Sequence, residues 1–426
     1  MSEGGIRAIE EVLQVRPVWV NGGGDLPGQI GAITQAMLAV AAGLCRHVLC
    51  IRTVWEASHA ALARSGRWAP AGGRATDMGE FRLPYGAASA AQWIALNASH
   101  YLHRYKVGRE VLGHIAITAR EGVQRNPEAI YRDPMTMDDY LSARMISSPF
   151  GLYDCDVPCD GAVAVVVSAV DTVADRPTPP VFVEAVGTQI LERLSWDQDT
   201  LTHLPQSLGP SAHLWTRTEL RPTDVDVALL YDGFTFNALS WLEGLGFRGL
   251  GEATDFIGDG STIKLGGALP LNPHGGQLSA GRLHGFGFVR EAMLHLRGEA
   301  VGRQVEGARV AAVSAGVARP RGPCSCRSST RPATGSAGTS PRSRSGTTEA
   351  LPLARRMRTL KEPSDDQVGG ARRRSPGRSA RAAGRCHRRS IGGFPPQVRA
   401  DRRIPATGEG APIDILPRLK AGDSNY

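Results

Sequence analysis

Apolar residues recur at the spacing of an α-helix in several stretches of the chain, so that side chains three and four positions apart lie on one face. In one of these stretches Ile30, Ile33 and Met37 form the apolar face, and Gly43 ends the pattern. The pattern predicts helices at Ile6–Gln14, Gln29–Ala42, Ala90–Tyr105, Val111–Gly122 and Thr235–Leu245, with others beginning at Asp138 and after Phe288.

Short continuous apolar runs, typical of strands buried on both faces, alternate with these helices. They predict strands at Arg16–Asn21, Val48–Ile51, Ala162–Ser168, Val181–Val186, Val225–Leu230 and Ala308–Ser314. The first strand, the turn at Gly22–Gly24, the helix and the next strand together are typical of a βαβ unit. We therefore expect a layered α/β fold built from two halves, at residues 1–170 and 171–316.

The apolar pattern stops after Gly316, where Arg, Ser, Pro, Gly and Thr dominate. This composition buries too little apolar surface to offset the entropy of ordering, so we expect residues 317–426 to form a disordered tail. A basic tail of this kind could bind nucleic acid. The break after Gly316 is abrupt, however, and we favour the hypothesis that the tail comes from a shifted reading frame.

The charged residues are also distributed unevenly on the two sides of Gly316. The net charge is +8, but the 111 residues from Gly316 onward carry 23 Lys and Arg against 8 Asp and Glu, leaving 26 basic and 33 acidic residues before them. The part predicted to fold is therefore mildly acidic, and nucleic acid is an unlikely partner for it. No apolar run reaches the roughly 18 residues of a membrane span, so we expect a cytoplasmic protein.

Cysteine usage agrees with a reducing compartment, because seven cysteines scattered over 426 residues form no disulfide framework. Cys155 and Cys159 lack the second ligand pair that a zinc site needs, so no metal is expected.

The stretch from Tyr231 to Arg297 concentrates the polar groups and glycines of the chain. It opens with Tyr231-Asp-Gly-Phe-Thr235 after an apolar run, and it ends in a glycine-rich loop that leads into a helix. Catalytic groups commonly lie where a buried strand ends, so we expect the active site here.

Several motifs along the chain resemble those of the thiolase superfamily. Asn272-x-x-Gly-Gly-x-Leu-Ser-x-Gly281 is similar to a thiolase motif, and the two predicted halves look like the duplicated thiolase fold. Leu152–Gly161, Tyr231–Thr235 and Gly275–Gly285 are closer to the thiolase-like lipid-transfer proteins, the sterol-carrier-protein-x group. The resemblance covers residues 16 to 316 and implies a thiolase-like fold with two mixed sheets. The expected first strand and the last strand are missing, so the fold is incomplete at both ends.

The departures from the thiolase pattern concern its catalytic residues. The nucleophilic cysteine of thiolases falls near Leu26 or Pro27, which cannot be acylated. Arg282 stands where thiolases place an activating histidine, and Tyr231 replaces the asparagine of their Asn-Glu-Ala-Phe segment. We therefore expect covalent thiolysis to be lost.

Some members of the lipid-transfer group resemble retro-aldolases that cleave β-hydroxyacyl-CoA thioesters of sterol side chains. That reaction needs a base for the β-hydroxyl proton and donors for the thioester enolate. Tyr231 and His284 are the candidate catalytic residues; Tyr231 needs a cation such as Arg282, or a hydrogen bond from His284, to act as a base at neutral pH. The candidate residues for binding substrate or CoA are Arg282, Gly276, Gly285, Phe286 and Gly287, with His274 ranked lower.

The resemblance also implies the ligands and partners. A coenzyme A thioester is expected as substrate, with no tightly bound cofactor. The family forms homodimers, and its aldolases usually have an OB-fold subunit with a zinc ribbon. Two other functions remain open: a non-catalytic acyl-CoA or lipid-binding protein, and an inactive fragment of a thiolase-family acyltransferase.

Overall fold

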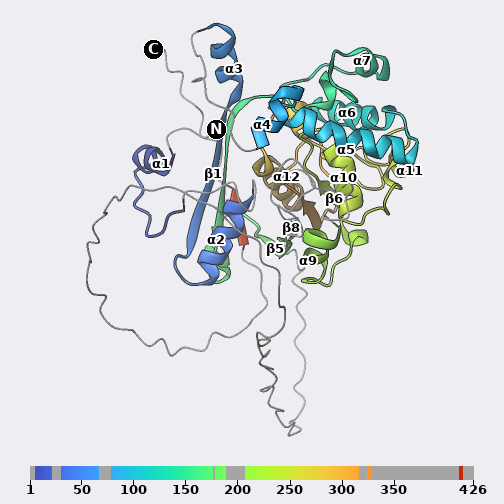
Figure 1. Cartoon of the computed structure of the whole chain (residues 1–426). Helices are drawn as coiled ribbons and strands as arrows, with labels where there is room; N and C mark the ends of the chain where they lie inside the picture. Colours follow the sequence, from blue (N-terminus) through green and yellow to red (C-terminus); the bar gives the residue numbers. More distant parts are fainter. Residues whose placement is uncertain are drawn as a thin grey trace, which may run out of the picture. The chain divides into compact units, whose positions relative to one another are not determined.

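The structure is a computed structural model, and it describes residues 5–21, 30–66, 78–175, 178–188, 207–315, 324–328 and 412–415. Figure 1 traces the elements along the chain. Every described residue belongs to one compact unit, which spans Met1–Arg331 and Gly408–Tyr426. Among the described residues no helix is long and apolar enough to cross a membrane.

The helices follow the predicted apolar pattern closely. Ala90–Tyr105 is helical over the predicted residues, and the other helices predicted in described segments are found within a few residues of their expected ends. The α-helices are α1 Gly5–Leu13, α2 Gly31–Ala41, α3 Glu56–Arg64, α4 Met78–Arg82, α5 Ala90–Tyr105, α6 Glu110–Val123, α7 Met137–Ser142, α9 Ala212–Trp215, α10 Thr235–Gly244, α11 Ala253–Ile257 and α12 Gly285–Arg297.

The described strands form a seven-stranded mixed sheet and a two-stranded ribbon, whereas we expected two mixed sheets. The order in the large sheet is β1-β4-β9-β5-β8-β7-β6, and β2 pairs with β3 in the ribbon. The strands are β1 His47–Trp55, β2 Met145–Ser147, β3 Phe150–Gly151, β4 Asp160–Ser168, β5 Val181–Val186, β6 Val227–Leu229, β7 Val310–Val313, β8 Cys324–Ser328 and β9 Pro412–Ile415.

Two expectations about strands are wrong. Arg16–Asn21 forms no strand: Val18 and Val20 are 87% and 52% exposed, so no element among the described residues covers this apolar run. The predicted βαβ unit is therefore absent, and β1 pairs antiparallel with β4, from His47 opposite Ser168 to Trp55 opposite Asp160. In the tail, β8 and β9 are strands rather than disordered segments, and the rest of residues 316–426 lies outside the described residues.

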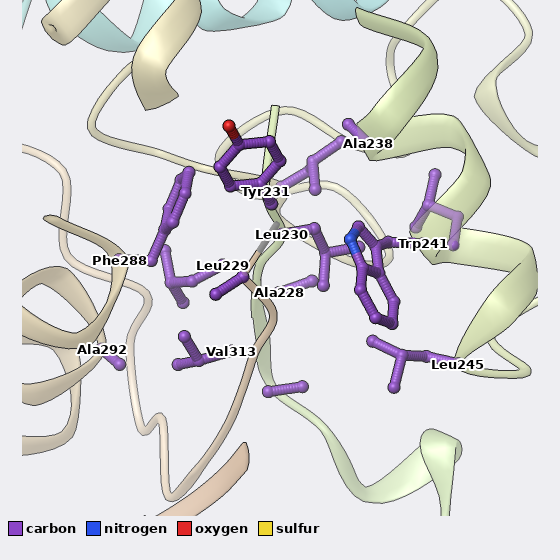
Figure 2. Close-up of a cluster of buried hydrophobic side chains, with 14 of the residues drawn as sticks. Ala228, Leu229, Leu230, Tyr231, Ala238, Trp241, Leu245, Phe288, Ala292 and Val313 are labelled. Carbon is purple, nitrogen blue, oxygen red and sulfur yellow. The ribbon is translucent and has the colours of Figure 1, made fainter. Parts of the chain in front are cut away.

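The parallel pair β6 and β7 leads to the glycine-rich stretch. β6 is fully buried because α12 packs on one side of it and α10 on the other, and Figure 2 shows Phe288 and Ala292 of α12 opposite Trp241 and Leu245 of α10. Such a strand has no solvent face and reads as a continuous apolar run. Tyr231 lies two residues beyond the end of β6, at the edge of this apolar cluster.

Helix α6 packs closely against the loop that carries the thiolase-like motif. A Cβ on Gly122 of α6 would lie 2.6 Å from the carbonyl oxygen of Pro273. The side chain of Asn126, just beyond α6, also donates a hydrogen bond to the His274 carbonyl at 3.0 Å. The position of the loop therefore depends on close contact with this helix.

We predict that Gly122→Ala lowers the free energy of unfolding by about 1–3 kcal/mol, because the added methyl group must displace the backbone at Pro273. Gly79→Ala in α4 is the matched control, since a Cβ there meets no atom within 4 Å. Alanine is a better helix former than glycine, so the free energy of unfolding of Gly79→Ala should equal that of the wild type or exceed it by up to about 1 kcal/mol. Urea unfolding of both variants measures the difference, and equal stabilities would show that the contact at Gly122 is unimportant.

Candidate active site

The loop after β6 is fixed to the end of the sheet by its backbone and by a buried carboxylate. Tyr231 donates its backbone N–H to Ser314 Oγ at 2.9 Å, just beyond the end of β7. Its phenol lies over Gly233, where a Cβ would come within 2.7 Å of Tyr231 Oη, and its ring meets Phe288 edge-on with 6.3 Å between centroids. The tyrosine side chain is 3% exposed.

Asp232 links this loop to the thiolase-like motif. Its carboxylate accepts hydrogen bonds from the Gln277 backbone N–H at 2.8 Å and from Asn272 Nδ2 at 3.0 Å. Asn272 also bonds both the N–H and the carbonyl of Leu230, so it joins the two loops at the end of β6. A Cβ on Gly276 would lie 1.7 Å from Asp232 Oδ2, and Gly276 has a φ of 56°, so only glycine fits there.

The segment Asp154–Cys159 crosses between these two loops and bonds to both. Asp156 donates its backbone N–H to the Gly233 carbonyl at 3.1 Å. Val157 donates to the Gln277 carbonyl and accepts from the Arg282 N–H, each at 3.0 Å. Three segments that lie far apart in the sequence are thereby held as one hydrogen-bonded unit.

The guanidinium of Arg282 lies between two carboxylates. Its Nε donates to Glu56 Oε2, and one of its terminal nitrogens lies 3.0 Å from Asp156 Oδ1. Arg282 also interacts electrostatically with Tyr231. The side chain is 30% exposed, and its charge is balanced within the protein rather than by solvent alone.

His284 occupies the position before α12, with a φ of 56°, so its backbone is in the left-handed region. Its Nε2 lies 3.5 Å from Glu56 Oε1, and the side chain is 16% exposed. Burial lowers the pKa of His284 below its ordinary value, and the adjacent Glu56 opposes this effect. Glu56 therefore connects His284 to Arg282.

The carboxyl groups of the site differ widely in pKa. Burial raises the pKa of Asp156 to about 7 although Arg282 opposes the shift, and burial likewise raises that of Asp232 to about 7. For Glu56, burial is outweighed by the close contact with His284 and by the charge and hydrogen bond of Arg282, and its pKa falls to about 2. Glu56 is thus ionised at neutral pH, whereas Asp156 and Asp232 are partly protonated.

The remaining candidate residues lie in different surroundings. Gly285 and Gly287 begin α12 next to His284, whereas Phe286 is 2% exposed and packs in the hydrophobic core. Gly276 is in contact with Asp232, and His274 is buried, with a pKa that burial lowers to about 4. Whether any of them binds substrate stays a prediction.

Sequence patterns did not identify two charged members of the site. Asp156 was visible within the Leu152–Gly161 motif, but nothing there indicated an arginine partner. Glu56 begins α3 at the end of β1, and 226 residues separate it from Arg282, so no local spacing could reveal the pair. Among the described residues, no group of three or more metal-binding side chains has the geometry to hold an ion.

The cysteines near the site are poorly suited to be nucleophiles. Burial raises the pKa of Cys155 to about 12 and that of Cys159 to about 11, and nearby carboxylates add to the effect. A thiol nucleophile needs a depressed pKa to be a thiolate at neutral pH. Neither cysteine meets this requirement.

Comparison with known proteins places this chain in a family. A family model described as Thiolase C-terminal domain-like matches residues 196–318. The steroid side-chain-cleaving aldolase of Thermomonospora curvata is 36% identical over 278 residues, which are 64% of this chain and 71% of the relative. The 17-hydroxy-3-oxo-4-pregnene-20-carboxyl-CoA lyase of Mycobacterium tuberculosis is 35% identical over 301 residues, 68% of this chain and 76% of the relative.

A solved structure is similar as well. The Ltp2-ChsH2(DUF35) aldolase has a TM-score of 0.63 and 31% sequence identity, over 71% of this chain and 77% of the matched chain. The thiolase-like α/β fold expected from the Asn272–Gly281 motif is confirmed. The chain belongs to the thiolase superfamily, in its group of thiolase-like lipid-transfer proteins and aldolases.

Proposed function

We propose that the protein cleaves a β-hydroxyacyl-CoA thioester of a steroid side chain by a retro-aldol reaction. The observation that carries the proposal is that backbone hydrogen bonds hold the loop of Tyr231 and the loop leading to His284 against the same segment, Asp154–Cys159, while Glu56 contacts both Arg282 and His284. The names of two relatives, a steroid side-chain-cleaving aldolase and a CoA lyase, support this substrate class. The acyl-CoA is the substrate, and the reaction needs no bound cofactor.

The proposed reaction begins with loss of the β-hydroxyl proton. His284 takes this proton, since burial favours the neutral imidazole that a base requires. The bond between the α- and β-carbons breaks, the β-carbon leaves as a ketone, and the electron pair passes to the thioester enolate. Tyr231 hydrogen-bonds the enolate oxygen, and the α-carbon then takes a proton from Tyr231, which His284 reprotonates. The products are a ketone and a shortened acyl-CoA, and no co-reactant is consumed.

Arg282 has a positioning role in this proposal. Its guanidinium already pairs with Glu56 and Asp156, which favours this role over binding of a CoA phosphate. Its charge near Tyr231 stabilises negative charge on the phenol after proton donation.

The proposal includes a partner and a place of action. The matched chain comes from a complex whose name includes a DUF35 component, and we propose that this chain also acts with a small OB-fold subunit. Homodimerisation and a cytoplasmic location remain parts of the same proposal.

We predict that Tyr231→Phe and His284→Ala each lower kcat by about 100-fold or more, because each removes a proton-transfer group. The assay supplies a steroid β-hydroxyacyl-CoA to the full chain with its OB-fold partner and follows release of the ketone. His103→Ala and Tyr85→Phe are matched controls at exposed positions and should retain wild-type turnover.

Unchanged turnover in Tyr231→Phe and His284→Ala would remove both residues from the mechanism. Binding of the ester by the wild-type chain without any cleavage would instead favour a lipid- or acyl-CoA-binding function.

The charge of the proposed site changes near neutral pH, and stability should follow. Asp156 has a pKa of about 7 in the folded chain, above the value of about 3.9 of an unfolded aspartate. The folded state therefore binds its proton more tightly, and this contribution to stability, complete below about pH 4, is lost as the pH rises through about 7. We predict that Asp156→Asn, which cannot ionise, loses less free energy of unfolding between pH 5 and pH 8 than the wild type.

Urea unfolding at the two pH values measures this difference. Asp171→Asn is the control, since Asp171 is exposed and pairs only on the surface with Arg46, and it should keep the wild-type dependence. If the free energy of unfolding changes with pH equally in Asp156→Asn and in the wild type, the raised pKa of Asp156 is contradicted.

A further inference from the structure

Glu56 contacts the candidate base and the arginine beside it through its two oxygens. Oε2 accepts from Arg282 Nε, and Oε1 lies 3.5 Å from His284 Nε2. The carboxylate is 19% exposed, so solvent screens these interactions only in part. Of the two acids beside Arg282, Glu56 also contacts His284.

The backbone around Glu56 is fixed on both sides. Glu56 donates its N–H to the Cys159 carbonyl at 3.2 Å. The next two residues, Ala57 and Ser58, donate their backbone N–H groups to the Asp160 carboxylate, which thereby caps the start of α3. Because Asp160 begins β4 and Trp55 pairs with it, the carboxylate of Glu56 is presented from a rigid junction.

Two arginines act against a positive charge on His284. Burial and the cations Arg52 and Arg282 disfavour a charged imidazole, while Glu56 favours it. When His284 takes a proton it becomes an imidazolium, so the reaction places a positive charge near the positive charges of Arg52 and Arg282. Glu56 is the group that offsets this charge.

The same contact fixes the orientation of the ring. His284 Nε2 is buried against Glu56, which leaves Nδ1 as the ring nitrogen available to a substrate proton in the proposed reaction. A neutral ring with its proton on Nε2, directed at the carboxylate, presents Nδ1 as the acceptor. The 3.5 Å separation is long for a hydrogen bond, and we expect it to shorten when the ring becomes charged.

We propose that Glu56 is a positioning residue of the retro-aldol site, which orients the His284 imidazole and stabilises the imidazolium formed when His284 takes the β-hydroxyl proton. The inference rests on the proposed function for its catalytic consequence. The coupling between Glu56 and His284 itself can be measured without turnover.

The test compares Glu56→Gln, which keeps the shape and removes the charge, with Glu56→Asp and wild type. NMR titration of the His284 ring, assigned by its absence in His284→Ala, should show its pKa lowered by at least about one unit in Glu56→Gln. The kcat for the steroid β-hydroxyacyl-CoA should fall about 10- to 100-fold in Glu56→Gln, which is a smaller loss than that expected for His284→Ala. KM should change less than about threefold. Glu56→Asp should recover part of both effects.

Glu128→Gln is the matched control, since Glu128 pairs with Arg290 of the same helix α12 at 3.2 Å and should leave the His284 titration and kcat unchanged. An unshifted His284 pKa in Glu56→Gln overturns the proposal, as does a loss of turnover that appears only in KM. If wild type cleaves no ester, the proposed function fails, and the NMR titration alone decides whether Glu56 controls His284.

Discussion

The candidate site depends on the placement of one positive charge, the guanidinium of Arg282, in the interior of the protein. A partly buried cation is costly unless carboxylates pair with it in good geometry. Glu56 and Asp156 supply that pairing, and they come from the junction of β1 and α3 and from the loop before β4. The site therefore forms only when the N-terminal strands and the glycine-rich loop are in place together, and the same carboxylate of Glu56 reaches the candidate base.

Asp232 is the second buried charge of the site, and it is held in another way. A backbone N–H and a side-chain amide donate hydrogen bonds to it, and burial raises its pKa to about 7. The charge of Asp156 adds to the effect of burial on the pKa of Asp232, and both carboxyl groups are partly protonated at neutral pH. Asp232 serves to connect the loop after β6 to the Asn272 motif, a structural role that leaves the chemistry to Tyr231 and His284.

Much of the local structure could be predicted from the sequence, because amphipathic helices and doubly covered strands leave strong patterns. Helix α5 and strand β5 have their predicted bounds, and the sequence predicts the loop after β6 as the place for chemistry. Arg16–Asn21 was not predictable in this way: its valines suggest a strand, but a strand also needs a partner, and that depends on tertiary structure. The antiparallel pairing of β1 with β4 and the reach of Glu56 to Arg282 are likewise properties of the folded chain, since each joins residues more than a hundred positions apart.

The proposed cleavage of a carbon–carbon bond proceeds without a covalent intermediate, and the raised pKa values of the buried Cys155 and Cys159 thiols agree with this. The most direct measurement quenches a single turnover of the chain with its OB-fold partner and a steroid β-hydroxyacyl-CoA, and records the products and the intact protein mass together. The account predicts equal amounts of ketone and shortened acyl-CoA, no requirement for added coenzyme A, and an unchanged protein mass. An acyl group attached to a cysteine, or product formation that requires free coenzyme A, would contradict it.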